Sequence, residues 1–351
     1  MDISPYLKLM VEKKASDLYF TSDAPVKIKI EGRQMPVGKT VLTAEMVREA
    51  AYGIMNEKQA RSFEVKHESD FAIAEEGVGR FRVNVFLQRG HVAMVLRYIP
   101  SEVPQLSELG LPDVLKELIM HKRGLLLVVG ATGSGKSTTI AAMMRHRNEN
   151  EASHILTIED PIEYNHPNAL SIINQREIGQ DTLSYANALK QSLREAPDIV
   201  VIGECRDRET MEASIQLAGT GQLAISTLHA NNAHQTMDRI INMFPEQMHK
   251  QLLLDLSINL RAIVSQRLVM GKNGRRLAAV EIMMNTPHIS DLILKGQIDR
   301  IREAMEESSE PGMQSFDEAL HRLYRDSRIT LEEALRYADS RANLEAKINF
   351  G

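Results

Sequence analysis

One short segment, residues 130–137, constrains the fold of this chain more than any other part of its sequence. It reads GATGSGKS and matches in full the phosphate-binding pattern GxxxxGK[ST]. The apolar run 125–129 precedes it and a helix-forming stretch follows it, which predicts a strand, a tight loop and a helix in that order. The alternative, a glycine-rich turn that only caps a helix, is disfavoured by the complete match in this context.

Backbone amides and two side chains of this loop are expected to hold a nucleotide. Glycines let N–H groups approach phosphate oxygens at a helix N-terminus. Lys136 would reach the β- and γ-phosphates, and Ser137 would ligate Mg²⁺. The predicted nucleotide-binding residues are Ala131, Thr132, Gly133, Ser134, Gly135, Lys136, Ser137 and Thr138.

A carboxylate follows a second apolar run, residues 198–202, and belongs to Glu204. In open parallel sheets the carboxyl ends of the strands meet at the edge where ligands bind. Glu204 is therefore placed to orient or deprotonate an attacking water, or to hold Mg²⁺ through a water. The other interpretation is an ordinary solvated glutamate at a strand end, and the phosphate-binding loop makes it the weaker one.

Two further strand ends carry polar side chains. Residues 154–158 lead into Glu159, Asp160 and Glu163. One interpretation is that these acids bind Mg²⁺ or water beside the loop. The other is that they form a turn, because Asp-Pro is common in turns, and the residues alone leave both open. The run 222–225 leads to His229, which either senses the γ-phosphate or is a satisfied polar group at a strand end.

The pattern of hydrophobic residues predicts four segments. The first alternates hairpins, with a turn at 31–33, and a helix at 43–63, as in a small α+β domain. Pro100 and Pro104 then mark a linker. In the third segment, short apolar runs separated by helices favour a parallel, doubly wound sheet. The last segment has a helical pattern. The predicted boundaries are 1–100, 101–112, 113–285 and 286–351.

Composition narrows the function classes. Lys+Arg number 42 and Asp+Glu 47, so the net charge of −5 argues against direct binding of nucleic acid. Cys205 is the single cysteine, which excludes a disulfide framework and fits a reducing compartment; neighbouring carboxylates should raise its pKa. No apolar run approaches the roughly 20 residues that span a bilayer. We therefore expect a cytoplasmic protein without a transmembrane segment.

The motifs occur in an order that resembles the secretion and type IV pilus ATPases, above all the retraction ATPases of the PilT/PilU group. The resemblance extends over nearly the whole chain and rests on seven segments. They are ASDL at 15–18, RFRVN at 80–84, TIEDPIE at 157–163, NQRE at 174–177, GECRD at 203–207, TLHAN at 227–231 and GMQSFD at 312–317.

This resemblance implies a RecA-like P-loop NTPase domain, a smaller PAS-like N-terminal domain and a helical C-terminal region. It implies a homo-hexameric motor that hydrolyses ATP with Mg²⁺ and powers pilus retraction in twitching motility. The implied partners are a PilT-like retraction ATPase and the inner-membrane platform protein at the pilus base. The implied catalytic residues are Glu204, Glu159, Glu163, His229, Arg80, Arg82 and Arg97.

The three arginines have a specific expected role. In the family, arginines of the N-terminal domain reach the nucleotide of a neighbouring subunit, where they offset charge on the γ-phosphate. Arg80, Arg82 and Arg97 are the candidates in this chain. The alternative for each is a place on a solvated basic strand face.

Some positions favour the PilU side of the group, among them Ala196 before Pro197 and the segment 287–296. One position departs from the family, because Gln222 stands where a histidine is usual. Glutamine hydrogen-bonds but cannot take up a proton or carry charge, so if the usual histidine tunes the γ-phosphate environment, turnover should be slower here. Two alternatives therefore stay open: a weakly hydrolysing accessory module that binds nucleotide, and a motor for DNA uptake or secretion.

Overall fold

The computed structural model describes residues 1–30, 32–100 and 102–350. Contacts divide the chain into two compact units, Met1–Glu102 with Glu163–Asn165, and Val103–Ile162 with His166–Gly351. Glu31 of the predicted turn and Ser101 of the predicted linker lie outside the described residues. The four predicted domain boundaries stay predictions.

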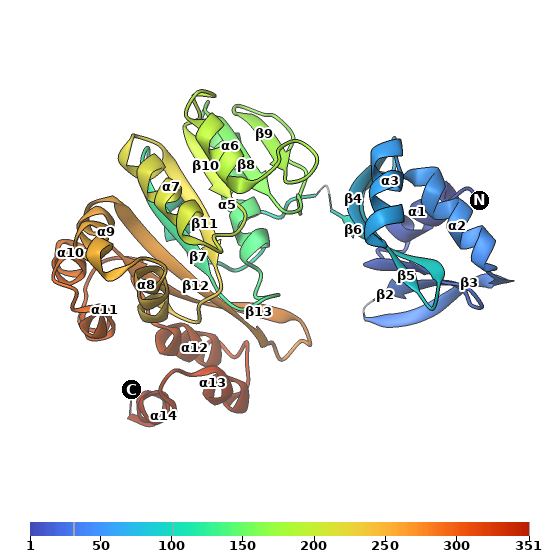
Figure 1. Ribbon diagram of the computed structural model, residues 1–351. Coiled ribbons are helices and arrows are strands. Elements are labelled where there is room, and N and C mark those ends of the chain that lie inside the picture. The colour runs from blue at the N-terminus through green and yellow to red at the C-terminus, as the bar shows by residue number, and fades with distance from the viewer. Residues whose placement is uncertain (31, 101, 351) are drawn as a thin grey trace. The chain divides into compact units, whose positions relative to one another are not determined.

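The first unit is an antiparallel sheet with three helices (Figure 1). The strands lie in the order β3-β2-β1-β6-β5-β4. The helices bury Leu7, Val47 and Phe63 against Leu18 and Phe81 of the sheet, which gives this unit a core of its own. Its elements are α1 (Ser4–Glu12), β1 (Asp17–Phe20), β2 (Pro25–Ile30), β3 (Arg33–Val41), α2 (Ala44–Ile54), α3 (Glu57–Lys66), β4 (Glu68–Glu75), β5 (Gly79–Gln88) and β6 (His91–Ile99).

The single helix expected over residues 43–63 is wrong, because two helices occupy this stretch. Thr43 caps α2 as predicted, since its side chain accepts a hydrogen bond from the Met46 amide at 3.2 Å. Met55 is extended, and Asn56 then begins α3 with a capping box. The Asn56 and Gln59 side chains each accept from the other's backbone amide, at 2.9 and 2.8 Å. Such reciprocal bonds favour a new helix start over continuation.

The second unit is built on a seven-stranded sheet in the order β13-β12-β7-β11-β10-β8-β9. The strands are parallel except β13, which runs antiparallel to β12. The expected α/β fold with a parallel sheet is confirmed. Strands β9, β12 and β13 were not predicted. The strands are β7 (Gly124–Val129), β8 (His154–Glu159), β9 (Ile172–Glu177), β10 (Ile199–Ile202), β11 (Leu223–Leu228), β12 (Leu260–Met270) and β13 (Arg276–Met284).

Helices cover both faces of this sheet (Figure 1). Leu125, Leu127 and Val129 of β7 pack into the core under α6 to α9, whereas Leu126 and Val128 pack into the core under α4 and α5. Because successive side chains of a strand point to opposite faces, an all-apolar strand fits a sheet buried on both sides. These helices are α4 (Val114–Ile119), α5 (Lys136–Asn150), α6 (Tyr185–Ser192), α7 (Arg208–Gly219), α8 (Ala233–Asn242) and α9 (Glu246–Asn259).

The chain ends in helices, as the sequence predicted. Phe316 and Leu320 of α12 pack with Ala334 of α13 and Leu344 of α14 against Val269 and Ala279 of the β12–β13 hairpin. This small core lies at the end of the hairpin and is separate from the two cores beneath β7. The C-terminal helices are α10 (Pro287–Leu294), a 3₁₀ turn η1 (Ile298–Arg300), α11 (Ile301–Glu306), α12 (Phe316–Arg325), α13 (Leu331–Tyr337) and α14 (Arg341–Phe350).

A bulge interrupts the pairing of β12 with β7. Leu260 lies opposite Leu125 and Ala262 lies opposite Leu126, so Arg261 is an extra residue in β12. Gly124 makes room for it, because a Cβ at this glycine would lie 2.4 Å from the Arg261 Cγ. The bulge shifts the alternation of every later residue in β12 relative to β7.

Candidate active site

The parallel register brings the predicted site segments of the second unit to one edge of the sheet. Val129 lies opposite Leu228, while Ile202 lies opposite Ser226 on one side and Ile158 on the other. The residues that follow these strands therefore emerge together. They include the phosphate-binding loop, Glu159, Glu204 and His229.

The loop after β7 folds around its own lysine. Gly130, Gly133 and Gly135 have φ of 153°, 78° and 92°, a range that favours glycine, and α5 begins directly afterwards. The Lys136 Nζ is buried and donates to the carbonyl oxygens of Gly130 at 2.8 Å and Ala131 at 3.1 Å. The ammonium group is thus already held inside the curve of the loop, where a phosphate would meet it.

Gln266 of β12 packs against the phosphate-binding loop and the start of α5. The sequence did not predict this contact. Its side chain is 4% exposed and its Oε1 accepts from the Thr139 hydroxyl of α5 at 2.7 Å. A Cβ at Gly130 would lie 2.5 Å from the Gln266 carbonyl oxygen. No local motif marks this glutamine, because its contact partner lies 127 residues away in the chain.

Glu204 contacts His229 and Arg206 at the centre of the site edge. Its Oε1 lies 2.9 Å from the His229 Nε2, and its Oε2 lies 2.7 Å from an Arg206 guanidinium nitrogen. Burial by itself would raise the pKa of Glu204, but the hydrogen bond and charge of Arg206, with His229 and Lys136, hold that pKa below its ordinary value. The carboxylate is therefore ionised at neutral pH and able to accept a hydrogen bond from water.

Tyr185, at the start of α6, lies between the two acidic strand ends and was not predicted. A Cβ at Gly203 would lie 3.1 Å from its hydroxyl oxygen. Burial and the nearby Asp160 carboxylate raise the pKa of Tyr185, so its hydroxyl stays protonated. Glu159 accepts hydrogen bonds from the Thr157 hydroxyl at 2.6 Å and the Gln175 amide at 3.1 Å. Glu159 is thus fixed as an acceptor in the same unit as Glu204.

The predicted acids Glu159 and Glu163 belong to different units of the chain. Glu163 is exposed and belongs by its contacts to the first unit, together with Tyr164 and Asn165. Glu159 belongs to the second unit and is half-buried at the end of β8. The two acids of this segment therefore have different surroundings.

The predicted arginines lie on neighbouring strands of the first unit. Arg80 and Arg82 are two residues apart in β5, and Arg97 of β6 lies directly opposite Arg82, so the three share one face of the sheet. The Arg82 Nε donates to Asp70 at 3.0 Å, and the Arg97 Nε donates to the buried Asp17 at 2.9 Å. Their guanidinium groups are thus oriented by carboxylates of their own chain.

Two further expectations concern single residues: Ser137 as a ligand of Mg²⁺, and Cys205 as a thiol with a raised pKa. Ser137 is the second residue of α5, and among the described residues no three His, Cys, Asp or Glu side chains gather as a metal site. Burial, with the nearby Asp207 carboxylate, raises the pKa of the Cys205 thiol to about 12, as the sequence indicated.

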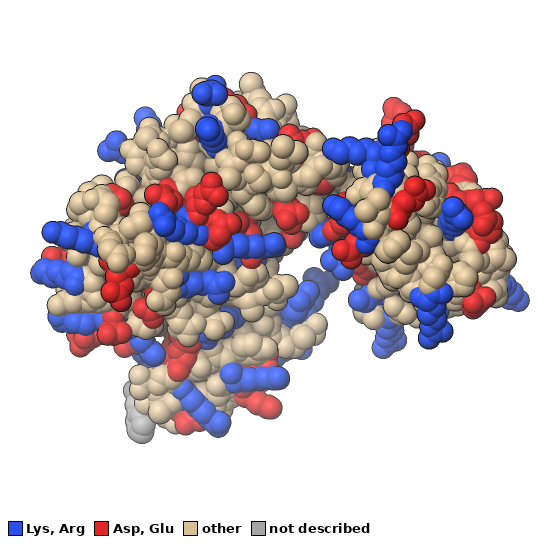
Figure 2. Space-filling view, in the orientation of Figure 1, with Lys and Arg blue, Asp and Glu red and all other residues tan. Residues whose placement is uncertain are grey.

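The molecular surface carries charges of both signs. On the face drawn in Figure 2, basic and acidic side chains of the described residues are interspersed over each unit. No helix in the described part of the chain combines the length and the apolar character needed to cross a lipid bilayer.

Comparison with known proteins identifies the family. The family model for type II/IV secretion system proteins matches residues 2–291. The chain belongs to this family. The type IV pilus ATPase PilU of Pseudomonas aeruginosa is 51% identical over 352 residues, covering 100% of this chain and 92% of that protein. The type IV pilus retraction ATPase PilT of the same organism is 40% identical over 334 residues, covering 95% and 97%.

A solved structure supports the same family assignment. The crystal structure of the pilus retraction motor PilT with bound ADP has a TM-score of 0.93, 41% identity, and coverage of 98% of this chain and 99% of that chain. The resemblance inferred from the motifs is confirmed, and identity is higher to PilU than to PilT. This member of the secretion ATPase family therefore has the fold of a retraction ATPase over nearly its full length.

Gln222 does not lie where the sequence interpretation needs it. It precedes β11, and its carbonyl accepts from the amide of Gly124, at the first residue of β7. The phosphate-binding loop follows the last residue of β7, so about 20 Å of strand separates Gln222 from the loop of the same chain. Its Oε1 instead accepts from the Thr220 hydroxyl at 2.8 Å. The expectation that residue 222 tunes the γ-phosphate environment is wrong for a nucleotide on the phosphate loop of the same chain.

We predict that Gly130→Ala weakens ATP binding at least about tenfold, because the new Cβ would overlap the Gln266 carbonyl and distort the loop. Titration of a fluorescent ATP analogue measures the effect. Gly274→Ala is the matched control, since Gly274 also has a positive φ, 75°, but a Cβ there would meet nothing within 4 Å. Equal affinities for both variants would contradict the assigned close packing.

We predict that Gln222→His leaves kcat for ATP within about twofold of the parent chain, because the position is remote from the phosphate loop of its subunit. Steady-state phosphate release measures this. A tenfold rise in kcat would show instead that residue 222 acts on a nucleotide, which would then have to belong to another subunit.

Proposed function

We propose that this chain is an ATP-hydrolysing motor that powers retraction of a type IV pilus. The observation that carries the proposal is the Glu204 carboxylate, ionised and in contact with His229, at the same sheet edge as a complete phosphate-binding loop. Family membership supports hydrolysis of ATP, and the likeness to PilU and PilT supports pilus retraction.

The proposed reaction is attack of water on the γ-phosphate. Backbone amides of the loop and the Lys136 ammonium group bind the phosphates, so Lys136 exchanges its bonds to the Gly130 and Ala131 carbonyls for phosphate oxygens. A carboxylate oxygen of Glu204 accepts a hydrogen bond from the water and takes its proton. The new P–O bond forms as the bond to the ADP oxygen breaks.

Residues of this chain also suit Mg²⁺. Mg²⁺ keeps several waters and binds mainly phosphates, so it needs few protein ligands. The Ser137 hydroxyl, next to Lys136 at the start of α5, is the proposed ligand, and Glu204 would contact the ion through water. When bound, Mg²⁺ supplies positive charge to the β- and γ-phosphates.

His229 and Arg206 set the orientation of Glu204. Each contacts a different carboxylate oxygen, and each oxygen keeps a further lone pair with which Glu204 can accept the water. The Arg206 side chain is 63% exposed, compared with 39% for His229. We therefore assign the less exposed His229 to holding Glu204 during the reaction. Glu159 is proposed to order further water, and Glu163 stays a proposed member of this set.

We further propose a homo-hexameric ring in which Arg80, Arg82 and Arg97 reach the nucleotide of a neighbouring subunit. The three arginines share one sheet face, and carboxylates orient two of them. This arrangement supports a common role for the three over three independent surface charges. A PilT-like ATPase and an inner-membrane platform protein are the proposed partners, at the cytoplasmic side of the pilus base. The accessory-module alternative loses the support that it drew from Gln222.

Substitutions at Lys136 and Glu204 should separate binding from hydrolysis. Lys136→Ala removes ground-state charge from the phosphates, so we expect ATP binding to weaken at least about tenfold. Glu204→Gln keeps the side-chain shape and removes the proton acceptor, so kcat should fall at least about a hundredfold with binding nearly unchanged. Isothermal titration and phosphate-release assays measure both. Equal losses of binding in the two variants would make Glu204 a structural residue.

Mixed rings test whether the arginines act on a neighbour. An Arg80→Ala/Arg82→Ala/Arg97→Ala chain keeps its own Glu204, whereas a Glu204→Gln chain keeps its arginines. If each subunit's arginines serve the neighbouring nucleotide, mixing the two inactive chains should restore turnover to at least about ten times that of either alone. Sedimentation with an ATP analogue confirms six-membered rings and their co-assembly. Co-assembly without restored turnover would contradict action between subunits.

A further inference from the structure

Strand β12 presents different chemistry on its two faces beyond the end of β7. Gln266 contacts the phosphate loop and α5 on one face. Ser265 and Arg267, its neighbours in the strand, lie on the opposite face, where they meet the segment after His229 and the C-terminal helices. One strand thus lies between the nucleotide loop and the last three helices of the chain.

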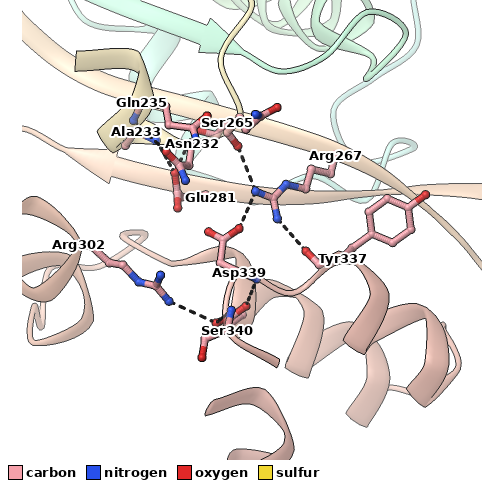
Figure 3. A network of polar contacts seen from close by, with 12 residues as sticks. Asn232, Ala233, Gln235, Ser265, Arg267, Glu281, Arg302, Tyr337, Asp339 and Ser340 are labelled. Carbon is pink, nitrogen blue, oxygen red and sulfur yellow. Dashed lines mark hydrogen bonds and ion pairs between the residues drawn. The ribbon is translucent and has the colours of Figure 1, made fainter. Parts of the chain in front are cut away.

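The Arg267 guanidinium group makes four contacts, three of them with the C-terminal region, and Figure 3 shows two of these, to Tyr337 and Asp339. It donates to the Tyr337 carbonyl at 2.7 Å and pairs with the Asp339 carboxylate at 2.6 Å. It also lies 3.8 Å over the ring centre of Phe316. A planar, multiply donating group is needed for this set, which a lysine ammonium cannot reproduce.

The fourth contact reaches the segment that carries His229. An Arg267 nitrogen donates to the Asn231 carbonyl at 3.3 Å, two residues after His229. Glu281, paired with Ser265 across the β12–β13 hairpin, accepts from the Ala233 amide at 2.7 Å. The segment between β11 and α8 is therefore held by two side chains of the hairpin, and one of these is itself held by α12 to α14.

The backbone at Asp339 is itself fixed by hydrogen bonds to Asp317 of α12. Its amide donates to the Asp317 carboxylate at 2.8 Å, and the Ser340 amide donates to the same carboxylate at 3.1 Å. These bonds fix the turn before α14, so the Asp339 side chain that pairs with Arg267 has little freedom. The contacts form a continuous chain from α12 to the backbone next to His229.

We propose that Arg267 is a positioning residue for ATP hydrolysis, through which the C-terminal helices hold His229 in contact with Glu204. The proposal rests on the proposed function of His229. It gives the chain beyond residue 291, where the family match ends, a part in the reaction. Arg267 touches neither the nucleotide loop nor Glu204 in the contacts described, so it acts through the Asn231 backbone.

Arg267→Ala should lower kcat about tenfold and leave KM for ATP within about twofold, because Gln266 and the phosphate loop lie on the other face of β12. Arg267→Lys should recover only part of the loss. The matched control is Arg341→Ala, which removes an exposed arginine paired with Glu345 within α14 and makes no contact to the His229 segment among the described residues. Thermal unfolding confirms that each variant is folded.

A double-mutant cycle with His229→Ala separates positioning from general loss of structure. If Arg267 acts through His229, Arg267→Ala should lower kcat in the parent chain but change it less than about twofold in the His229→Ala chain. Equal losses in both backgrounds would overturn the proposal. If His229→Ala alone leaves kcat unchanged, the proposed function of His229 fails instead.

A second variant guards against loss of folding. Asp339→Asn keeps the shape and a hydrogen-bond acceptor but removes the charge that pairs with Arg267. It should lower kcat about threefold, again with KM unchanged and again only when His229 is present. An Asp339→Asn chain that is folded and fully active, together with additive loss from Arg267→Lys, would also overturn the proposal.

Discussion

Parallel pairing of β7, β11, β10 and β8 is the constraint on which the site depends. Hydrogen bonds between these strands fix their carboxyl ends at one level, so segments from residues 130, 159, 204 and 229 meet without any long-range motif. The strands can align this way because each is apolar on both faces and buried between two helical layers. Carboxylates appear only at strand ends, and the polar side chains inside β8 and β11 are the buried hydroxyls of Thr157, Ser226 and Thr227.

Electrostatic balance at that edge follows from the same geometry. Lys136, Arg206 and His229 approach the Glu204 carboxylate from three segments, and their combined effect outweighs the cost of burying the charge. Each of these side chains has its own oxygen partner, including the loop carbonyls for Lys136. Nucleotide binding therefore replaces existing polar contacts of these side chains, such as those of Lys136 to the loop carbonyls, with contacts to phosphate.

The sequence predicted the parts of the fold that local patterns encode. The phosphate loop, its flanking strand and helix, the Thr43 cap and the acidic strand ends follow from composition and spacing within a few residues. The break at Asn56 was missed because apolar periodicity continues across it while the capping box competes with it. Gln266, Tyr185 and Arg267 were missed because their partners lie in other parts of the chain. Gln222 was misplaced because the family motif was followed without the strand direction: it precedes β11, so the rule that brings carboxyl ends to the site puts it at the opposite end.

The bulge at Arg261 decides which chemistry each face of β12 receives. With the extra residue, Gln266 points to the phosphate loop and Arg267 to the C-terminal helices. Regular pairing of the same number of residues would exchange the two faces, whereas loss of one residue between 260 and 262 would remove the bulge and leave the later register with β7 unchanged. Arg261 is consequently the residue that β12 could lose while Gln266 and Arg267 keep their opposite sides.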